Sequence, residues 1–245
     1  MGRRAWAYGI AGAASAALIV ASLVGALPSD WTEAVGFVAG AWCVWLVVKD
    51  NIWNWPVGLV TSAFYVVVFG NAKLLTDAGL QVVYIVLGLY GWYWWLHGGD
   101  ARKKLPIGRT PRLEGWLTVG GVAAGAVLLV MVRLGFETRS PIPEVWSAVL
   151  ADLSGRGPVA HGVVWADAVT TAVSLGAQYL LTRKYIENWI VWIAVNAVYI
   201  PLYLYKHLVL TAVLYLVYLL LAIAGYKEWL RLERVRAVAN EGVHP

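Results

Sequence analysis

The feature that most constrains this chain is a series of eight apolar stretches, most of them about as long as a bilayer is thick. A helix needs about 20 mainly apolar residues to cross the hydrocarbon core, and backbone groups in lipid are satisfied only within a helix or a closed barrel. Of the 245 residues, 60% are hydrophobic and 13% are charged, against about 25% charged in soluble domains. The sequence therefore predicts an all-α integral membrane protein with helices over 5–27, 31–48, 55–69, 74–96, 113–134, 163–182, 189–205 and 208–230.

Basic residues gather in alternate loops, and this pattern predicts how the helices are oriented. They precede the first stretch and follow the second, fourth, sixth and eighth, whereas the other loops are acidic or mixed. Because cytoplasmic loops carry an excess of Lys and Arg, eight crossings put every basic cluster and both termini in the cytoplasm. The net charge of +5 is spread over these loops, so it does not indicate a nucleic-acid partner. In the long outer loop, residues 144–153 predict a short interfacial helix.

The chain contains an internal repeat, which appears when its second half is aligned with its first at one constant shift. Asn54 and Trp55 align with Asn188 and Trp189, and the alignment continues without a gap for about forty residues. Further aligned pairs are Tyr65 and Tyr199, Phe69 and Tyr203, Leu74 and Leu208, Ala78 and Ala212, Leu80 and Leu214, Tyr84 and Tyr218, Gly91 and Gly225, and Trp95 and Trp229. Apolar composition alone would match Leu and Val, but not Asn, Trp, Tyr and Gly in this order.

The repeat predicts the architecture of the membrane domain. Each copy covers three helices, and one further helix lies between the copies, so both copies face the same way about an axis along the membrane normal. The predicted organisation is an N-terminal hydrophobic helix, a first three-helix repeat, a central segment, a second three-helix repeat and a cytoplasmic tail that frays after Arg236. The central segment holds a basic cytoplasmic loop, the connector helix and an outer loop. The five ranges are 1–29, 30–97, 98–161, 162–231 and 232–245.

Parallel repeats predict a cavity at their interface near the middle of the bilayer. Asn196 lies about 13 Å from the inner end of its predicted helix, and Gln81 lies about 10 Å from the outer end of its own. Aromatic residues follow each of them at helical spacing on the same helix face. The candidate substrate-binding residues are Trp189, Trp192, Asn196, Gln81, Tyr84, Thr211, Tyr215 and Tyr218. Their uncharged surface suits a flat ring with hydroxyl groups, or an organic cation. The same side chains could instead form interfacial belts or bridge helices.

Other features argue against active pumping and catalysis. No predicted span carries a charged residue near its middle, where a proton relay or charge-coupled pump would normally place one, and no Gly-rich phosphate loop occurs. The acids, bases and metal ligands of an enzyme do not converge in the sequence, and Cys43 is its single cysteine. We therefore expect no enzymatic activity, no metal and no cofactor. Gradient-driven uniport is the simplest remaining mechanism, with the proline-bearing helices 55–69 and 189–205 as gates.

Strings of residues over most of the chain resemble a known family. They are DWTEAVG (30–36), NWPVG (54–58), LQ (80–81), LYGWYWW (89–95), NWIVW (188–192), Asn196, TAVLY (211–215) and GYKEW (225–229). In these strings the chain resembles the PnuC-type vitamin transporters, whose best-known members carry nicotinamide riboside. The resemblance implies three-one-three helices in the plasma or inner membrane and facilitated diffusion. It also implies phosphorylation that traps the vitamin for NAD biosynthesis, and a homo-oligomer, a trimer in this family.

The resemblance bears on the substrate through one pair of residues. Trp189 and Trp192 are similar to the nicotinamide riboside form, whereas a Gln at position 192 would be more like the thiamine branch. The pyridinium and ribose diol of nicotinamide riboside fit tryptophan faces and the amides of Asn196 and Gln81. Thiamine is cationic too, so another vitamin of the family, thiamine or riboflavin, is the alternative substrate. A membrane enzyme or a light-absorbing receptor is the alternative from another class.

Overall fold

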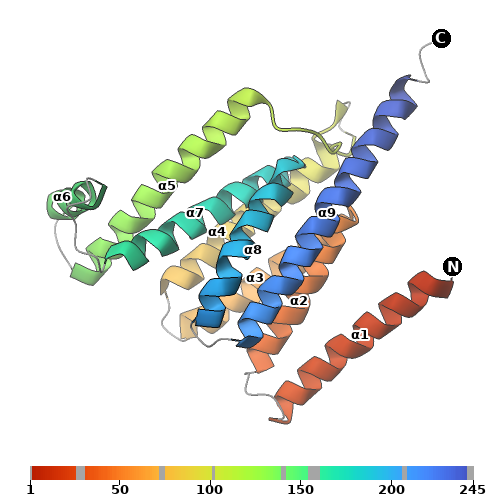
Figure 1. The fold of residues 1–245 in the computed structure, drawn as a ribbon, viewed down its shortest axis with the longest axis horizontal. Coiled ribbons are helices and arrows are strands. Elements are labelled where there is room, and N and C mark those ends of the chain that lie inside the picture. The colour runs from red at the N-terminus through yellow and green to blue at the C-terminus, as the bar shows by residue number, and fades with distance from the viewer. Residues whose placement is uncertain are drawn as a thin grey trace. The chain divides into compact units, whose positions relative to one another are not determined.

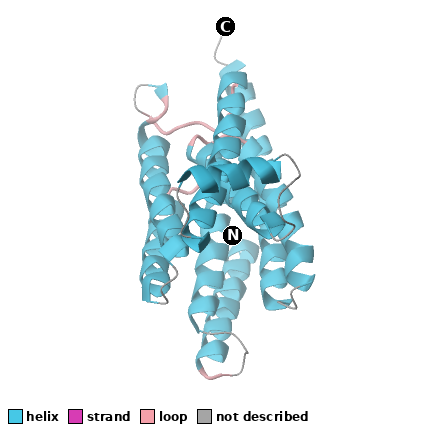
Figure 2. Ribbon diagram, turned by 90° about the vertical axis from the view of Figure 1, so that its left-hand side faces the viewer, coloured by secondary structure: helices cyan, strands magenta, loops and turns pink. Residues whose placement is uncertain are grey.

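The computed structural model describes residues 2–25, 31–71, 75–100, 103–138, 142–153, 161–205 and 209–241. In these ranges the chain is helical apart from turns, short connections and one isolated backbone bridge, and Figure 2 draws helices and loops only. The helices (Figure 1) are α1 (Gly2–Leu23), α2 (Trp31–Val48), α3 (Asn54–Asn71), α4 (Leu75–His97), α5 (Arg112–Thr138), α6 (Ile142–Leu153), α7 (His161–Thr182), α8 (Glu187–Tyr205) and α9 (Val209–Glu241). The all-α prediction is confirmed.

The predicted helices agree with the observed elements except at the end of the first helix and at the end of the chain. The first helix is expected to run to Leu27, but α1 ends at Leu23, because Gly25 adopts a left-handed conformation (φ 71°) that terminates the helix. Each of the eight apolar stretches corresponds to one helix, and the short helix predicted over residues 144–153 is observed as α6, which follows α5. Its interfacial location stays a prediction. The expected fraying after Arg236 is wrong, because α9 continues to Glu241. An ion pair between Glu228 and Arg231, three residues apart, stabilises the helix just before this extension, and the alanines that follow favour helix. Residues 242–245 lie outside the described part of the chain.

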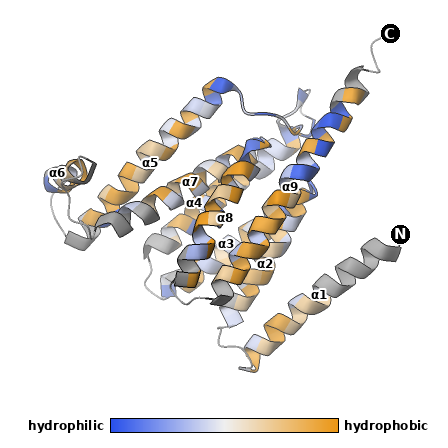
Figure 3. Ribbon diagram, in the orientation of Figure 1, coloured by the Kyte–Doolittle hydropathy of each residue, from blue (hydrophilic) through white to orange (hydrophobic). Residues whose placement is uncertain are grey.

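The helices present large apolar side chains on their outer surfaces. On α5 the side chains of Leu113, Trp116 and Leu117 are between 64% and 75% exposed, and Figure 3 shows apolar residues along most of the described helices. Two stretches of the described residues, 112–135 and 212–236, are long and apolar enough to cross a membrane, and three shorter apolar helices accompany them. Such exposure is costly in water and expected in lipid.

The chain divides into two compact units, residues 1–92 and 93–245, with the boundary inside α4. In the first unit α2 packs on both α1 and α3. In the second unit α7 packs on α5 and α8, α8 packs on α9, and α6 packs on α5. A core of aliphatic residues, including Val130, Val149 and Ala168, joins α5, α6 and α7. The second unit therefore contains a continuous series of packed helices that ends in the α8–α9 pair.

The turn that precedes α3 and the equivalent turn that precedes α8 have the same hydrogen bonds. In the first, Asp50 N–H donates to Val47 and Asn51 N–H donates to Leu46; in the second, Lys184 N–H donates to Leu181 and Tyr185 N–H donates to Leu180. This is the Schellman pattern at a helix C-terminus. Its left-handed residue is Asp50 (φ 50°) in one turn and Lys184 (φ 55°) in the other. The backbone of this turn is therefore preserved although its side chains differ.

The equivalent asparagines and tryptophans of the two copies also make equivalent contacts. Asn54 and Asn188 each donate from Nδ2 to a carbonyl three residues earlier. Trp55 and Trp189, 3% and 2% exposed, each lie against a glycine of a later helix. A Cβ added at Gly225 would lie 2.5 Å from the Trp189 ring, and one added at Gly91 would overlap the Trp55 ring. Glycine is therefore required at both positions to admit the indole.

We expect Gly225→Ala to lower the stability of the folded protein by about 1–3 kcal/mol, because the added methyl group overpacks the Trp189 site. Gly121→Ala is the matched control, since a Cβ there meets nothing within 4 Å and alanine favours helix by up to about 1 kcal/mol. Thermal unfolding of the purified protein in detergent measures both. An unchanged melting temperature for Gly225→Ala would contradict the packing described.

Candidate functional site

The candidate site in the second unit lies on the facing surfaces of α8 and α9. On α8 the spacing of Trp192, Asn196 and Tyr199 puts these residues on one face of the helix. Asn196 is 5% exposed, and its Nδ2 donates to the Trp192 carbonyl at 2.7 Å. This bond keeps the amide beside the helix and fixes its direction. A buried amide on an aromatic helix face can recognise hydroxyl groups of a ligand.

Tyrosine rings connect this face of α8 to α9. Tyr199 of α8 and Tyr215 of α9 have ring centroids 4.9 Å apart, and Tyr215 meets Tyr218 at 6.0 Å in an edge-to-face arrangement. Aromatic pairs at these separations attract one another. The structure thus places Tyr215 on the face of α9 that contacts α8, with Tyr218 beside it on the same helix. Pro201 lies inside α8, two residues beyond Tyr199, and interrupts the helical hydrogen bonding there.

The remaining predicted residues are placed as follows. Gln81 and Tyr84 lie on α4 in the first unit, and both are half-buried. Thr211 lies in the first turn of α9, and its side chain is outside the described part of the structure. Trp192 is half-buried on α8. A binding role for each of these residues stays a prediction.

Trp189 belongs to a buried tryptophan cluster, defined here as Trp95, Trp189 and Trp229. Trp189 meets Trp229 edge to face at 5.4 Å, and Trp229 meets Trp95 at 6.1 Å. The three side chains are at most 2% exposed. Trp95 also donates from Nε1 to the Leu181 carbonyl at 3.2 Å. The cluster packs the second unit one helical turn from Trp192, so Trp189 has a clear packing role.

Charged residues gather beyond this cluster, at what we term the basic end of the second unit. Lys184 is 2% exposed, and its Nζ lies 4.1 Å from the centre of the Trp95 ring, a cation–π geometry that offsets burial of the charge. Arg183 lies over Trp94 at 4.3 Å and pairs with Glu114 of α5 at 3.3 Å. Burial and a hydrogen bond to Glu114 raise the pKa of Tyr185 to about 12, so this phenol stays neutral at physiological pH.

The loop between α4 and α5 crosses the basic end, and residues 103–111 are termed the connector strap. Gly108 forms a parallel bridge with Tyr185: its N–H donates to Lys184, and its carbonyl accepts from Ile186. Thr110 donates from its backbone N–H and its hydroxyl to Glu187 of α8, and Arg109 makes two bonds to Glu233 of α9. The sequence reading missed these contacts because it treated the basic loop only as an orientation signal.

Together these features define a class. The described helices present apolar side chains outward, and in the second unit an uncharged face of amide and aromatic groups lies between α8 and α9. The described charged residues of these two helices lie at the basic end. This is the construction of a helical membrane transporter for a small molecule.

The comparisons identify the family. The chain matches the family described as "Nicotinamide mononucleotide transporter" over residues 30–231, and it belongs to that family of membrane transporters, which are not enzymes. It is 26% identical over 211 residues to the nicotinamide riboside transporter PnuC of Escherichia coli (strain K12), a match that covers 84% of this chain and 88% of the relative. It is 29% identical over 204 residues to the riboflavin/roseoflavin transporter RibM of Streptomyces davaonensis, a match that covers 81% and 84% of the two chains.

The fold is also similar to that of a solved structure. The crystal structure of the vitamin B3 transporter PnuC matches with a TM-score of 0.57 and 24% identity, and the match covers 91% of each chain. The predicted resemblance to the PnuC-type family is confirmed.

We expect Trp189→Ala to lower stability by about 3–5 kcal/mol, because it removes a large ring from a closed site. Trp189→Phe keeps a ring but removes Nε1–H, a buried donor without a hydrogen-bond partner among the described residues. Melting temperature and ligand affinity of both variants separate packing from binding. Loss of affinity in Trp189→Phe at unchanged stability would assign the indole N–H to the substrate.

Proposed function

We propose that this chain carries nicotinamide riboside across the cell membrane by facilitated diffusion, and that phosphorylation inside the cell traps the vitamin for NAD biosynthesis. The observation that carries the proposal is the face formed by Trp192, buried Asn196 and the Tyr199–Tyr215 pair. The side chains described on this face are uncharged. Such a face can bind the cationic pyridinium through aromatic rings and the ribose through an amide.

The relatives support the same substrate. PnuC of Escherichia coli is named a nicotinamide riboside transporter, and the match covers most of both chains. In the proposed mechanism the vitamin moves down its own gradient, because the described residues of the site include no acidic or basic side chain that would couple transport to protons. Trapping by phosphorylation keeps the free vitamin concentration low inside the cell and so maintains that gradient.

The proposed architecture is two parallel three-helix repeats joined by one connector helix, α5, with α1 as an extra N-terminal helix. The shared turns before α3 and α8 support equivalence of the copies. Gln81 and Tyr84 of the first repeat and Thr211 of the second are proposed as further substrate-binding residues. Both termini are proposed to lie in the cytoplasm, and a homo-oligomer, a trimer by the family resemblance, stays a prediction.

Riboflavin is the second candidate substrate, and the similarity to RibM favours it over thiamine. Its isoalloxazine ring and ribityl chain also combine a flat surface with hydroxyl groups. The two vitamins differ in charge, however, because the pyridinium of nicotinamide riboside is cationic and the isoalloxazine ring is neutral. Competition between them therefore tests whether the aromatic face selects a cation.

We expect purified protein to bind nicotinamide riboside more tightly than riboflavin or thiamine in calorimetric titrations. Trp192→Ala and Asn196→Ala should each raise Kd at least tenfold, about 1.4 kcal/mol, because each removes a side chain from the proposed ligand surface. Val198→Ala, an exposed position on the same helix, is the control. If riboflavin bound most tightly, the proposed substrate would be wrong but the protein would still be a vitamin transporter. An unchanged Kd in both Trp192→Ala and Asn196→Ala would mean that the substrate binds elsewhere.

A further inference from the structure

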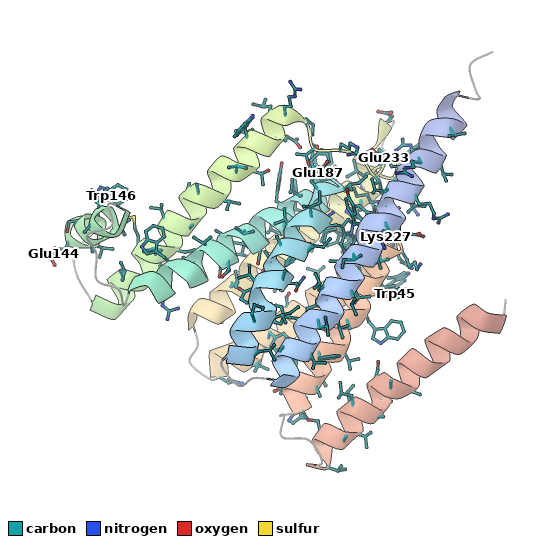
Figure 4. The ribbon with its side chains drawn as sticks, in the orientation of Figure 1. Trp45, Glu144, Trp146, Glu187, Lys227 and Glu233 are labelled. Carbon is teal, nitrogen blue, oxygen red and sulfur yellow. The ribbon has the colours of Figure 1, made fainter. Side chains whose placement is uncertain are left out.

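The connector strap joins the ends of the two helices that carry the candidate site. Consecutive residues reach different helices: Thr110 binds Glu187 in the first turn of α8 with bonds of 2.9 and 2.8 Å, and Arg109 binds Glu233 of α9 with bonds of 3.0 and 3.3 Å. Figure 4 shows Glu187 and Glu233 at the end of the second unit where the connector strap lies. The strap therefore ties the basic ends of α8 and α9 together.

The contacts of the strap differ in how easily they break. The bridge at Gly108 uses two backbone hydrogen bonds, and both Thr110 bonds to Glu187 are partly buried. The Arg109 side chain is 61% exposed and that of Glu233 is 26% exposed, so water and salt compete with this pair. The strap is thus fixed to α8 and only weakly held to α9.

The tryptophan cluster lies between the strap and the site. Trp189 follows Glu187 by two residues on α8, and Trp229 precedes Glu233 by four residues on α9. Their edge-to-face contact, together with Gly225, joins the two helices at this level. Separation of the α9 end from α8 would part this contact and expose the site from the basic end.

This attachment belongs to one copy of the repeat. The alignment of the two copies places Trp53 at the position of Glu187 and Gly99 at the position of Glu233. Neither acid therefore has a counterpart, although the backbone of the turn is shared. Trp53 is 64% exposed, so its side chain does not form a buried contact like that of Glu187.

We propose that the connector strap is a latch that positions α8 and α9, with Arg109 and Glu233 as its releasable pair. This inference rests on the proposed transport function. While the pair is closed, the tryptophan cluster seals the basic end; when it opens, α9 moves away from α8, and the vitamin can pass between the site and that side of the membrane. Arg109, Thr110, Glu187 and Glu233 are positioning residues, because they act through the two helices and do not touch the candidate site.

The test measures how readily a thiol reagent reaches a position behind the seal. Ala222 is 2% exposed on α9, three residues before Gly225, and Cys43→Ala removes the native cysteine. In a Cys43→Ala, Ala222→Cys background, purified protein is labelled with a cationic methanethiosulfonate. We expect Arg109→Gln and Glu233→Gln each to label about two- to fivefold faster, the range for a pair of this exposure. The double variant should be no faster than either single variant.

Two comparisons isolate the latch from a general charge effect. Arg109→Gln and Glu233→Gln change the net charge in opposite directions, so a field effect on a cationic reagent would move their labelling rates apart. Glu228→Gln and Arg231→Gln break an ion pair of similar geometry that lies within α9 alone, and should label at the background rate. The exchanged pair Arg109→Glu with Glu233→Arg should restore slow labelling. Equal rates in all variants, or the same acceleration in the control pair, would overturn the latch.

Uptake into proteoliposomes gives a second measurement that does not depend on the Ala222→Cys background. Latch variants should change the maximal rate of nicotinamide riboside uptake at least twofold while Kd stays within twofold, and the exchanged pair should restore the rate. An unchanged maximal rate would also contradict the latch. The labelling experiment needs no substrate, so it tests the latch even if the proposed substrate is wrong. If the latch variants were labelled at the parent rate and still took up the vitamin normally, the latch proposal would be rejected and the proposed transport function would stand.

Discussion

The packing of an indole against a glycine is the contact on which each copy of the repeat depends. Lipid tails are as apolar as leucine, so helices in a bilayer gain little from hydrophobicity when they associate and need close packing instead. Trp55 against Gly91 and Trp189 against Gly225 provide it. Each tryptophan follows a Schellman turn, so local backbone hydrogen bonds help to set the direction in which it enters the helix pair.

This constraint explains why much of the fold could be predicted from the sequence. Apolar length located all eight long helices, since lipid leaves the backbone few choices, and Glu144 to Leu153 predicted α6. The alignment paired Asn54 with Asn188, and in the structure these two side chains bond to the backbone of equivalent turns in the same way. The end of α9 was misjudged because the last residues of a chain were expected to fray, whereas the helix continues to Glu241 through a segment that contains two helix-favouring alanines.

The candidate site was predictable only in part. Helical spacing puts Trp192, Asn196 and Tyr199 on one face, and the pairing of Tyr199 with Tyr215 follows from the face that α9 presents. The connector strap left no such signal. Its bridge at Gly108 uses backbone atoms, and Arg109 and Glu233 are 124 residues apart. Basic residues in a loop can set the orientation of the helices in the membrane or form ion pairs, and the composition of the loop does not show which role a given residue has.

The uncharged face between α8 and α9 fits the proposed function of a passive carrier. A fixed charge at the site would bind a cationic vitamin tightly or repel it, and in either case would slow one half of the cycle. Aromatic faces and an amide attract the cation with less desolvation cost. Around α8, the charged contacts lie at the basic end, where Arg183, Lys184 and Glu187 fix the start of this helix. The site therefore remains neutral while the helices that form it are held by charges about two turns away.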